Sequence, residues 1–283
     1  MRLLSFVTSD GSRQWGVQVG DGVVSALSLS PSLDAFVQSG GSLDDVQVLA
    51  QAGKAPVHAL ADVKIDAPLR HPSKIVAIGQ NYMDHCRECN APIPTRPLVF
   101  TKFTTSINGP TGEILWRRDL TTQVDWEVEM GVVIGKLARR VSAEDALDYV
   151  FGYTVVNDIS ARDLQDGDGQ WVRGKSLDTF CPMGPAVVTA DIIPDPQKLG
   201  LRCLVNGTPV QDSNTEEMIF DVRYLISFLS QAFTLLPGDV ILSGTPYGIG
   251  AARDPQIFLH DGDVVESEID GIGRLRNVCR EED

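Results

Sequence analysis

Short apolar runs separated by turn dipeptides mark the first 66 residues. Runs of this length suit strands, and the Asp-Gly pairs between them favour tight turns. The pattern predicts strands at residues 3–8, 14–19 and 22–27. The pattern at residues 31–53 predicts one or two short helices, with Pro31 and Ser42 near the helix starts. This part of the chain is therefore expected to be a small β-rich unit.

Strand patterns also dominate the rest of the chain. The clearest lies at residues 124–134, where apolar residues alternate with Asp125, Glu127 and Glu129, the period of a half-buried strand. Further strands are predicted at residues 74–79, 98–103, 153–157, 201–205, 240–243 and 264–269. Two helices are predicted, a short one opened by Ser142 and ended near Gly152, and an amphipathic one at residues 222–233.

The order of these elements predicts a mostly β protein of the α+β class. Helices are too few and too irregularly placed for a doubly wound βαβ array. Residues 68–72 hold two prolines and form a stiff linker. We therefore predict a small N-terminal domain at residues 1–70 and a larger domain, which carries the chemistry, at residues 71–283.

The net charge of −14, from 24 Lys and Arg against 38 Asp and Glu, narrows the choice of partners. Repulsion from phosphate counts against nucleic acid or an anionic membrane surface as the main partner. The longest uncharged stretch, residues 224–238, is too short and too polar to span a bilayer. The N-terminus lacks a long apolar segment, and the five cysteines form no disulfide pattern, so we expect a cytoplasmic protein.

Paired carboxylates provide the first candidate site. On a strand, Glu127 and Glu129 project from the same face and repel each other unless a proton or a cation lies between them. Oxygen ligands suit Mg²⁺ or Mn²⁺, and Ca²⁺ less well. Asp158, which follows an apolar strand, is the candidate partner of these two glutamates. Asn-Asp after a strand is also ordinary turn chemistry. The alternative for this motif is a solvent-exposed acidic strand face.

A second candidate group comprises His85 and Glu88, three residues apart after a predicted strand. On a helical turn the carboxylate would orient the imidazole and raise its basicity, which suits a general base for water. The alternative is an exposed surface pair of little consequence.

Side chains for anion binding provide a third candidate group. Arg162 suits a carboxylate, with Gln165 beside it, and Lys175 suits an oxyanion. The Gly-rich stretch Ser-Gly-Thr-Pro-Tyr-Gly-Ile-Gly, residues 243–250, offers backbone amides and Thr245 to an anionic group, or is simply a tight loop. It has neither the spacing of a Walker motif nor that of a dinucleotide fingerprint.

Together these motifs resemble the fumarylacetoacetate hydrolase superfamily. Six segments stand in that family's order: Ile-Gly-Gln-Asn-Tyr and His-Cys-Arg-Glu within 78–88, Pro-Leu-Val-Phe-Thr-Lys at 97–102, Val-Asp-Trp-Glu-Val-Glu-Met at 124–130, the segment 156–165, the segment 174–185, and the segment 237–250. The similarity is greatest to the group containing acylpyruvases, 2-hydroxyhepta-2,4-diene-1,7-dioate isomerases and oxaloacetate tautomerases.

The resemblance implies a fold, an assembly and residue roles. It implies a mixed β-sandwich roll with a small N-terminal domain, in a homodimer. Glu127, Glu129 and Asp158 would bind one Mg²⁺ or Mn²⁺ per subunit. His85 and Glu88 would be the water-activating pair on a mobile lid. The residues expected to line the substrate pocket are Lys102, Arg162, Gln165, Lys175 and Thr245, with Lys175 also catalytic.

Two enzyme activities and one non-enzymatic role follow as hypotheses. The first is hydrolysis of a C–C bond in a 2,4-dioxo acid such as an acylpyruvate, with the metal and Lys175 stabilising the enolate that leaves. The alternative keeps the metal and enolate but omits water attack, giving an isomerase, tautomerase or decarboxylase of a 2-oxo acid. We expect hydrolysis because both His85 and Glu88 are present. The third hypothesis is a non-catalytic metal-binding or ligand-sensing protein.

Overall fold

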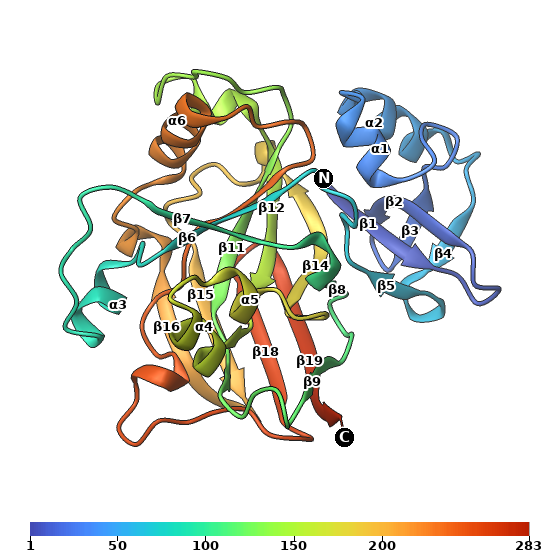
Figure 1. Ribbon diagram of the computed structural model, residues 1–283. Helices are drawn as coiled ribbons and strands as arrows, with labels where there is room; N and C mark the ends of the chain where they lie inside the picture. Colours follow the sequence, from blue (N-terminus) through green and yellow to red (C-terminus); the bar gives the residue numbers. More distant parts are fainter. Residues whose placement is uncertain (283) are drawn as a thin grey trace.

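The computed structural model describes residues 1–282, and its first 66 residues form a small lobe beside a larger one (Figure 1). The small lobe contains β1 (Arg2–Val7), β2 (Arg13–Val19), β3 (Gly22–Ser25), α1 (Leu33–Gln38), α2 (Leu43–Ala52), β4 (Val57–Ala59) and β5 (Lys64–Asp66). The predicted three strands and two short helices are confirmed. The hydroxyl of Ser32 begins α1 by accepting a hydrogen bond from the Ala35 amide.

The larger lobe contains most of the strands. These are β6 (Ile75–Gly79), β7 (Leu98–Lys102), β8 (Ile107–Asn108), β9 (Ile114–Arg117), β10 (Val124–Asp125), β11 (Val128–Ile134), β12 (Val150–Asn157), β13 (Ser160–Ala161), β14 (Cys181–Thr189), β15 (Gly200–Val205), β16 (Thr208–Asn214), β17 (Val240–Leu242), β18 (Val264–Ile269) and β19 (Gly273–Glu282). Its α-helices are α3 (Met83–Glu88), α4 (Arg162–Asp168), α5 (Val172–Lys175) and α6 (Val222–Ala232). Short 3₁₀ turns lie at Leu60–Asp62, Thr104–Ser106, Ala146–Tyr149, Ala190–Ile192, Thr215–Glu217 and Gly250–Ala252.

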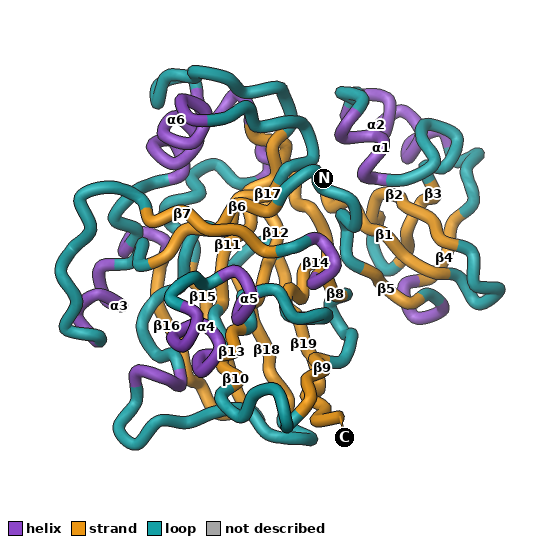
Figure 2. The backbone as a smooth tube through the Cα atoms, in the orientation of Figure 1, coloured by secondary structure: helices purple, strands orange, loops and turns teal. Residues whose placement is uncertain are grey.

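Strands make up most of the larger lobe, with α3 and α6 at its edge and α4 and α5 drawn over the strands (Figure 2). A 12-stranded sheet runs in the order β4-β3-β2-β1-β14-β12-β11-β17-β6-β7, with β5 beside β1 and β8 beside β14. A five-stranded sheet has the order β16-β15-β18-β19-β9, and β10 pairs with β13. Antiparallel pairing of β1 with β14 joins the two lobes in one sheet, and β17 and β6 are parallel. The mostly β, α+β fold is confirmed.

The strand that carries the acidic motif differs from its prediction. The alternating pattern predicts one half-buried strand, but the structure has two strands, β10 and β11, and all residues of both are buried. Strands β12 and β17 flank β11 on its two edges. The Glu127 amide donates to the side chain of Asn157 rather than to a neighbouring strand, which interrupts the ladder. The solvent-exposed acidic face considered above is therefore wrong.

Other differences are local. After Ser142 the chain forms only the 3₁₀ turn Ala146–Tyr149 before β12 begins, although the Ser142 hydroxyl does accept a hydrogen bond from the Asp145 amide. Helix α6 is confirmed, with Asp221 as its N-cap and its apolar face in the main core. The pattern missed β14, β19 and the two short helices α4 and α5.

Two sequence-based exclusions can be compared with the structure. None of the helices described in residues 1–282 has the length and apolar character needed to cross a membrane. All five cysteines are free thiols, as expected. The division into domains at residue 70 stays a prediction.

Candidate active site

Three carboxylates meet at the centre of the larger lobe. Glu127 lies between β10 and β11, Glu129 lies in β11, and Asp158 follows β12. The antiparallel register pairs Val128 with Asn157, so Asp158 comes beside Glu127. One oxygen from each carboxylate lies within 4.8 Å of the others, and the three residues are 0–6% exposed. The structure thus brings together the three residues predicted to bind metal.

Buried cations neutralise two of these carboxylates. The Lys175 ammonium donates to Glu127 Oε2 at 2.8 Å and to Asp158 Oδ2 at 2.9 Å. Arg162 Nη2 lies 2.5 Å from Glu127 Oε1, and Lys102 pairs with Asp158. Burial raises the pKa of Glu127, but the Lys175 and Arg162 charges outweigh burial and hold that pKa at about 2. The same contacts raise the pKa of Lys175 against the effect of its burial.

Glu129 is the carboxylate that these cations leave least compensated. Its Oε2 accepts a hydrogen bond from the Gly244 amide at 2.7 Å. Burial, followed by the charges of Asp158 and Glu127, raises the pKa of Glu129 well above its usual value. A divalent cation would relieve this repulsion. A buried set of three carboxylates fits the oxygen ligands that Mg²⁺ and Mn²⁺ prefer.

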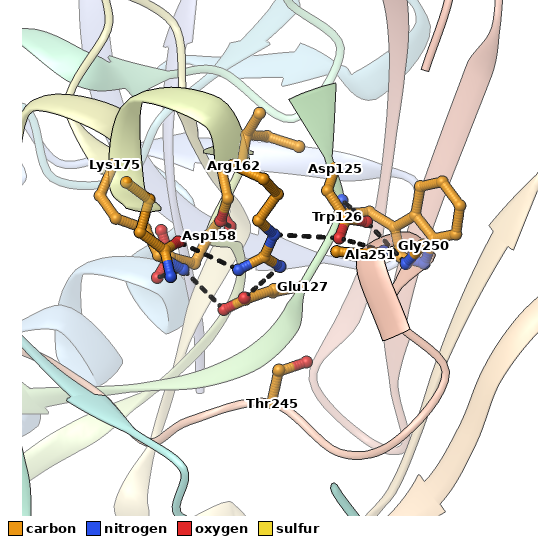
Figure 3. A network of polar contacts seen from close by, with 12 residues as sticks. Asp125, Trp126, Glu127, Asp158, Arg162, Lys175, Thr245, Gly250 and Ala251 are labelled. Atoms are coloured by element: carbon orange, nitrogen blue, oxygen red, sulfur yellow. Dashed lines mark hydrogen bonds and ion pairs between the residues drawn. The ribbon is translucent and has the colours of Figure 1, made fainter. Parts of the chain in front are cut away.

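Asp125 belongs to the site although sequence reasoning assigned it no role. It is fully buried, and its Oδ2 accepts from Arg162 Nε at 3.1 Å. The amides of Gly250 and Ala251 donate to the same carboxylate at 2.8 and 2.9 Å. Figure 3 shows the Arg162 guanidinium between Asp125 and Glu127. The alternation that selected Glu127 places Asp125 on the same strand face, so the signal was present.

The predicted His85–Glu88 pair forms on α3. His85 Nδ1 lies 3.5 Å from Glu88 Oε2, and both Glu88 oxygens accept from the Gly248 amide at 3.0 Å. Burial lowers the pKa of His85, but hydrogen bonds with Cys89 and Glu88 outweigh burial and raise that pKa to about 9. The imidazole is therefore a proton donor at neutral pH rather than a free base.

A cavity of about 220 Å³ is lined by His85 of this pair and by Glu127 of the carboxylate cluster. The predicted site residues that line it are His85, Glu127, Arg162, Gln165, Lys175 and Thr245. Lys102 lies outside this lining because its ammonium is buried against Asp158 and the Ile159 carbonyl. Phe100 and Trp171 form an apolar wall, with their rings in an edge contact.

The Gly-rich loop holds the Thr245 hydroxyl and the Gly244 amide in place. The Thr245 hydroxyl donates to the Val128 carbonyl and accepts from Gln211, so the loop is held against β11. Gly244 has a φ of +93°, and a Cβ there would lie 2.8 Å from the Asn81 side chain. Glycine at this position therefore lets the amide reach Glu129.

The family model described as Fumarylacetoacetate (FAA) hydrolase C-terminal matches residues 74–280. The chain belongs to this family. The relatives described below are enzymes of this family, and we assign this chain as an enzyme of the same family.

Three relatives show how the family's activities diverge. Oxaloacetate tautomerase fahd2, mitochondrial, of Xenopus laevis is 44% identical over 98% of this chain and 89% of its own. The 2,4-didehydro-3-deoxy-L-rhamnonate hydrolase of Sphingomonas is 46% identical over 83% of this chain and 85% of its own. The solved maleylpyruvate hydrolase from Sphingobium, in complex with a manganese(II) ion and pyruvate, is 29% identical, with a TM-score of 0.84 and full coverage of both chains.

Proposed function

We propose that this enzyme is a metal-dependent tautomerase of a small 2-oxo acid of the oxaloacetate type. The observation that carries the proposal is the cavity, which is lined both by Glu127 of the buried three-carboxylate cluster and by His85, the partner of Glu88. Similarity to the Xenopus tautomerase over nearly the whole chain supports tautomerisation over the C–C hydrolysis expected from the motifs.

The cation would be Mg²⁺ or Mn²⁺, one per subunit, held by Glu127, Glu129 and Asp158. The solved relative that contains manganese and pyruvate supports this choice. When bound, the metal supplies a Lewis acid that polarises the 2-oxo group and acidifies the neighbouring C–H bond.

The chain's own groups position the substrate and move its proton. Lys175 stabilises negative charge on the substrate oxygen, since its ammonium is buried at the cavity wall. Arg162 and Gln165 orient the carboxylate end. His85 transfers the proton at the carbon atom, and Glu88 keeps the imidazole in place through the Gly248 amide.

Hydrolysis of a 2,4-dioxo acid is the second candidate function. Two observations favour it: the His85–Glu88 pair that water activation needs, and the 46% identity to the Sphingomonas hydrolase. In this case His85 must be neutral to accept a proton from water.

Product analysis with four compounds and Mg²⁺ separates the two functions. The compounds are acetylpyruvate, fumarylpyruvate, oxaloacetate and a hydroxyheptadienedioate. The proposal predicts conversion between the enol and keto forms of oxaloacetate with acetylpyruvate left intact. Release of pyruvate from acetylpyruvate, without any effect on oxaloacetate, would instead establish the hydrolase.

Assembly and location extend the proposal. We infer a homodimer in the cytoplasm, with a small-molecule substrate and neither nucleic acid nor membrane as partner. Light scattering on the protein as it elutes from a size-exclusion column gives its molar mass and so tests the homodimer.

A further inference from the structure

Cys89 lies beside the proton-transfer pair and differs from the other cysteines of the chain. It is the one exposed thiol of the five. Its Sγ lies 3.9 Å from His85 Nδ1 and 4.0 Å from His85 Nε2. Its amide donates to the His85 carbonyl at 3.0 Å, so the residue continues the helical register of α3. Positions i, i+3 and i+4 therefore place His85, Glu88 and Cys89 on one helix face.

The three side chains offer one nitrogen, one oxygen and one sulfur ligand. One ligand atom from each lies within 4.8 Å of the other two. With Zn–S near about 2.3 Å and Zn–N or Zn–O near about 2.0–2.1 Å, ligands around a tetrahedral Zn²⁺ are about 3.4–3.6 Å apart. The observed separations of 3.5 Å for His85–Glu88 and 3.9 Å for His85–Cys89 are close to these values.

We propose that His85, Glu88 and Cys89 form a second metal site, which selects Zn²⁺ and inhibits the enzyme when occupied. The donor types separate it from the carboxylate cluster: thiolate and imidazole suit Zn²⁺, whereas three carboxylates suit Mg²⁺ or Mn²⁺. Three protein ligands leave a fourth position for water at the cavity, which Cys89 and His85 both line.

Binding at this site changes the protonation of its ligands. The Cys89 thiol and the His85 imidazolium each release a proton to solvent as they coordinate the ion. A coordinated imidazole nitrogen no longer carries a proton, and the Glu88 carboxylate is engaged by the metal. Inhibition therefore rests on the proposed role of His85, whereas zinc binding itself does not.

Cobalt spectroscopy tests the site independently of activity. Co²⁺ added to the Mg²⁺-loaded enzyme is expected to give a near-ultraviolet band of thiolate-to-cobalt charge transfer that Zn²⁺ abolishes. The carboxylate cluster has no sulfur ligand and gives no such band. Cys89→Ser, at an exposed position, must lose the band. Cys86→Ala, which removes the buried thiol of the same helix, must keep it. A band that is absent in the wild type, or unchanged in Cys89→Ser, overturns the proposal.

Turnover tests the inhibition. With excess Mg²⁺, the Zn²⁺ concentration for half-inhibition should rise at least about tenfold in Cys89→Ser, because even outer-shell partners of a metal are worth about 10–100-fold in affinity. The activity of each protein is expressed relative to its own activity without zinc. Equal inhibition of both proteins would mean that Zn²⁺ acts at the carboxylates, and would refute inhibition through Cys89. If no 2-oxo acid is turned over, the proposed function fails, while the cobalt band still decides the metal site.

Discussion

Glu129 and Glu127 lie two residues apart, yet their environments are opposite. Glu127 pairs with Arg162 and Lys175, whereas Glu129 accepts only a backbone hydrogen bond among the contacts described in residues 1–282. In the metal-free protein the charge of Glu129 therefore opposes folding, while that of Glu127 supports it.

Glutamine variants at the two positions should diverge in stability. Glu129→Gln should leave the thermal midpoint of the metal-free protein unchanged or higher, because it removes an uncompensated buried charge. Glu127→Gln should cost roughly 3 kcal/mol, because two buried cations lose a partner. Both variants should lose Mg²⁺ affinity in calorimetric titrations. Wild-type affinity in Glu129→Gln would exclude this residue as a metal ligand.

Asp125 acts through Arg162 rather than on the substrate. Asp125→Asn replaces one acceptor oxygen with an NH₂ group, so that two of the four N–H donors lose their acceptor. These donors are Arg162 Nε and the amides of Trp126, Gly250 and Ala251. We expect kcat/KM to fall about 100-fold, the effect of misplacing a binding group by about 1 Å, with metal affinity retained. The matched control is Asp163→Asn, whose carboxylate bonds to Thr121 instead. Equal kinetics for the two variants would contradict the positioning role.

The raised pKa of His85 predicts how activity depends on pH. The imidazole is protonated below its pKa of about 9 and neutral above it. Protonation of the enol carbon needs the charged form, so enol-to-keto conversion should be flat below pH 9 and fall above it. Hydrolysis needs the neutral form and should rise toward pH 9. A rate profile across this range, measured for both reactions, distinguishes the candidate functions.

At the scale of elements, the residue that precedes α5 lies against β6 at the cavity wall. A Cβ on Gly79 of β6 would lie 2.4 Å from the Trp171 ring, which precedes α5. Gly79→Ala should therefore displace Trp171 and shift Lys175 at the end of α5. We expect kcat/KM to fall by about tenfold or more, and Gly79→Ala combined with Trp171→Leu to recover activity. Wild-type kinetics in the single variant would show that the wall adapts freely.

Sequence patterns predicted the strands whose apolar residues alternate with polar ones or form a continuous run better than they predicted the other elements. Pro182 and Pro185 argue against a central strand, yet β14 pairs with both β1 and β12. Helices α4 and α5 have no apolar stripe, since they present Arg162, Gln165 and Lys175 inward. Elements whose buried face is polar lack the periodicity on which prediction rests.

Local sequence patterns also predicted only part of the candidate site. Single motifs left Glu127 and Glu129 as either ligands or an exposed face, and Asp158 as either their partner or turn chemistry. The resemblance decided between these interpretations. The pairing of Lys102 with Asp158, 56 residues apart, is set by the sheet order and not by any local pattern. The role of Asp125 required the loop at Gly250, 125 residues away, to be in place.

At the scale of the whole molecule, both the sheets and the buried charges converge on one cavity. Glu127, between β10 and β11, brings a carboxylate to its wall, helices α4 and α5 bring Arg162 and Lys175, and α3 brings His85. With a net charge of −14, binding of an anionic substrate calls for a local positive charge, from a metal or from clustered Lys and Arg. We propose that this cavity uses a divalent metal to interconvert the enol and keto forms of a 2-oxo acid.

The most direct measurement follows the enol absorbance of oxaloacetate with the enzyme stripped by EDTA and then resupplied with Mg²⁺. Stripping should abolish the catalysed enol-to-keto conversion, and Mg²⁺ should restore it fully, because hard oxygen ligands hold the ion reversibly. Glu129→Gln should stay inactive after the same resupply. Full turnover by the metal-free enzyme would contradict the proposed function, as would Mg²⁺-loaded enzyme that leaves the rate of conversion at its uncatalysed value.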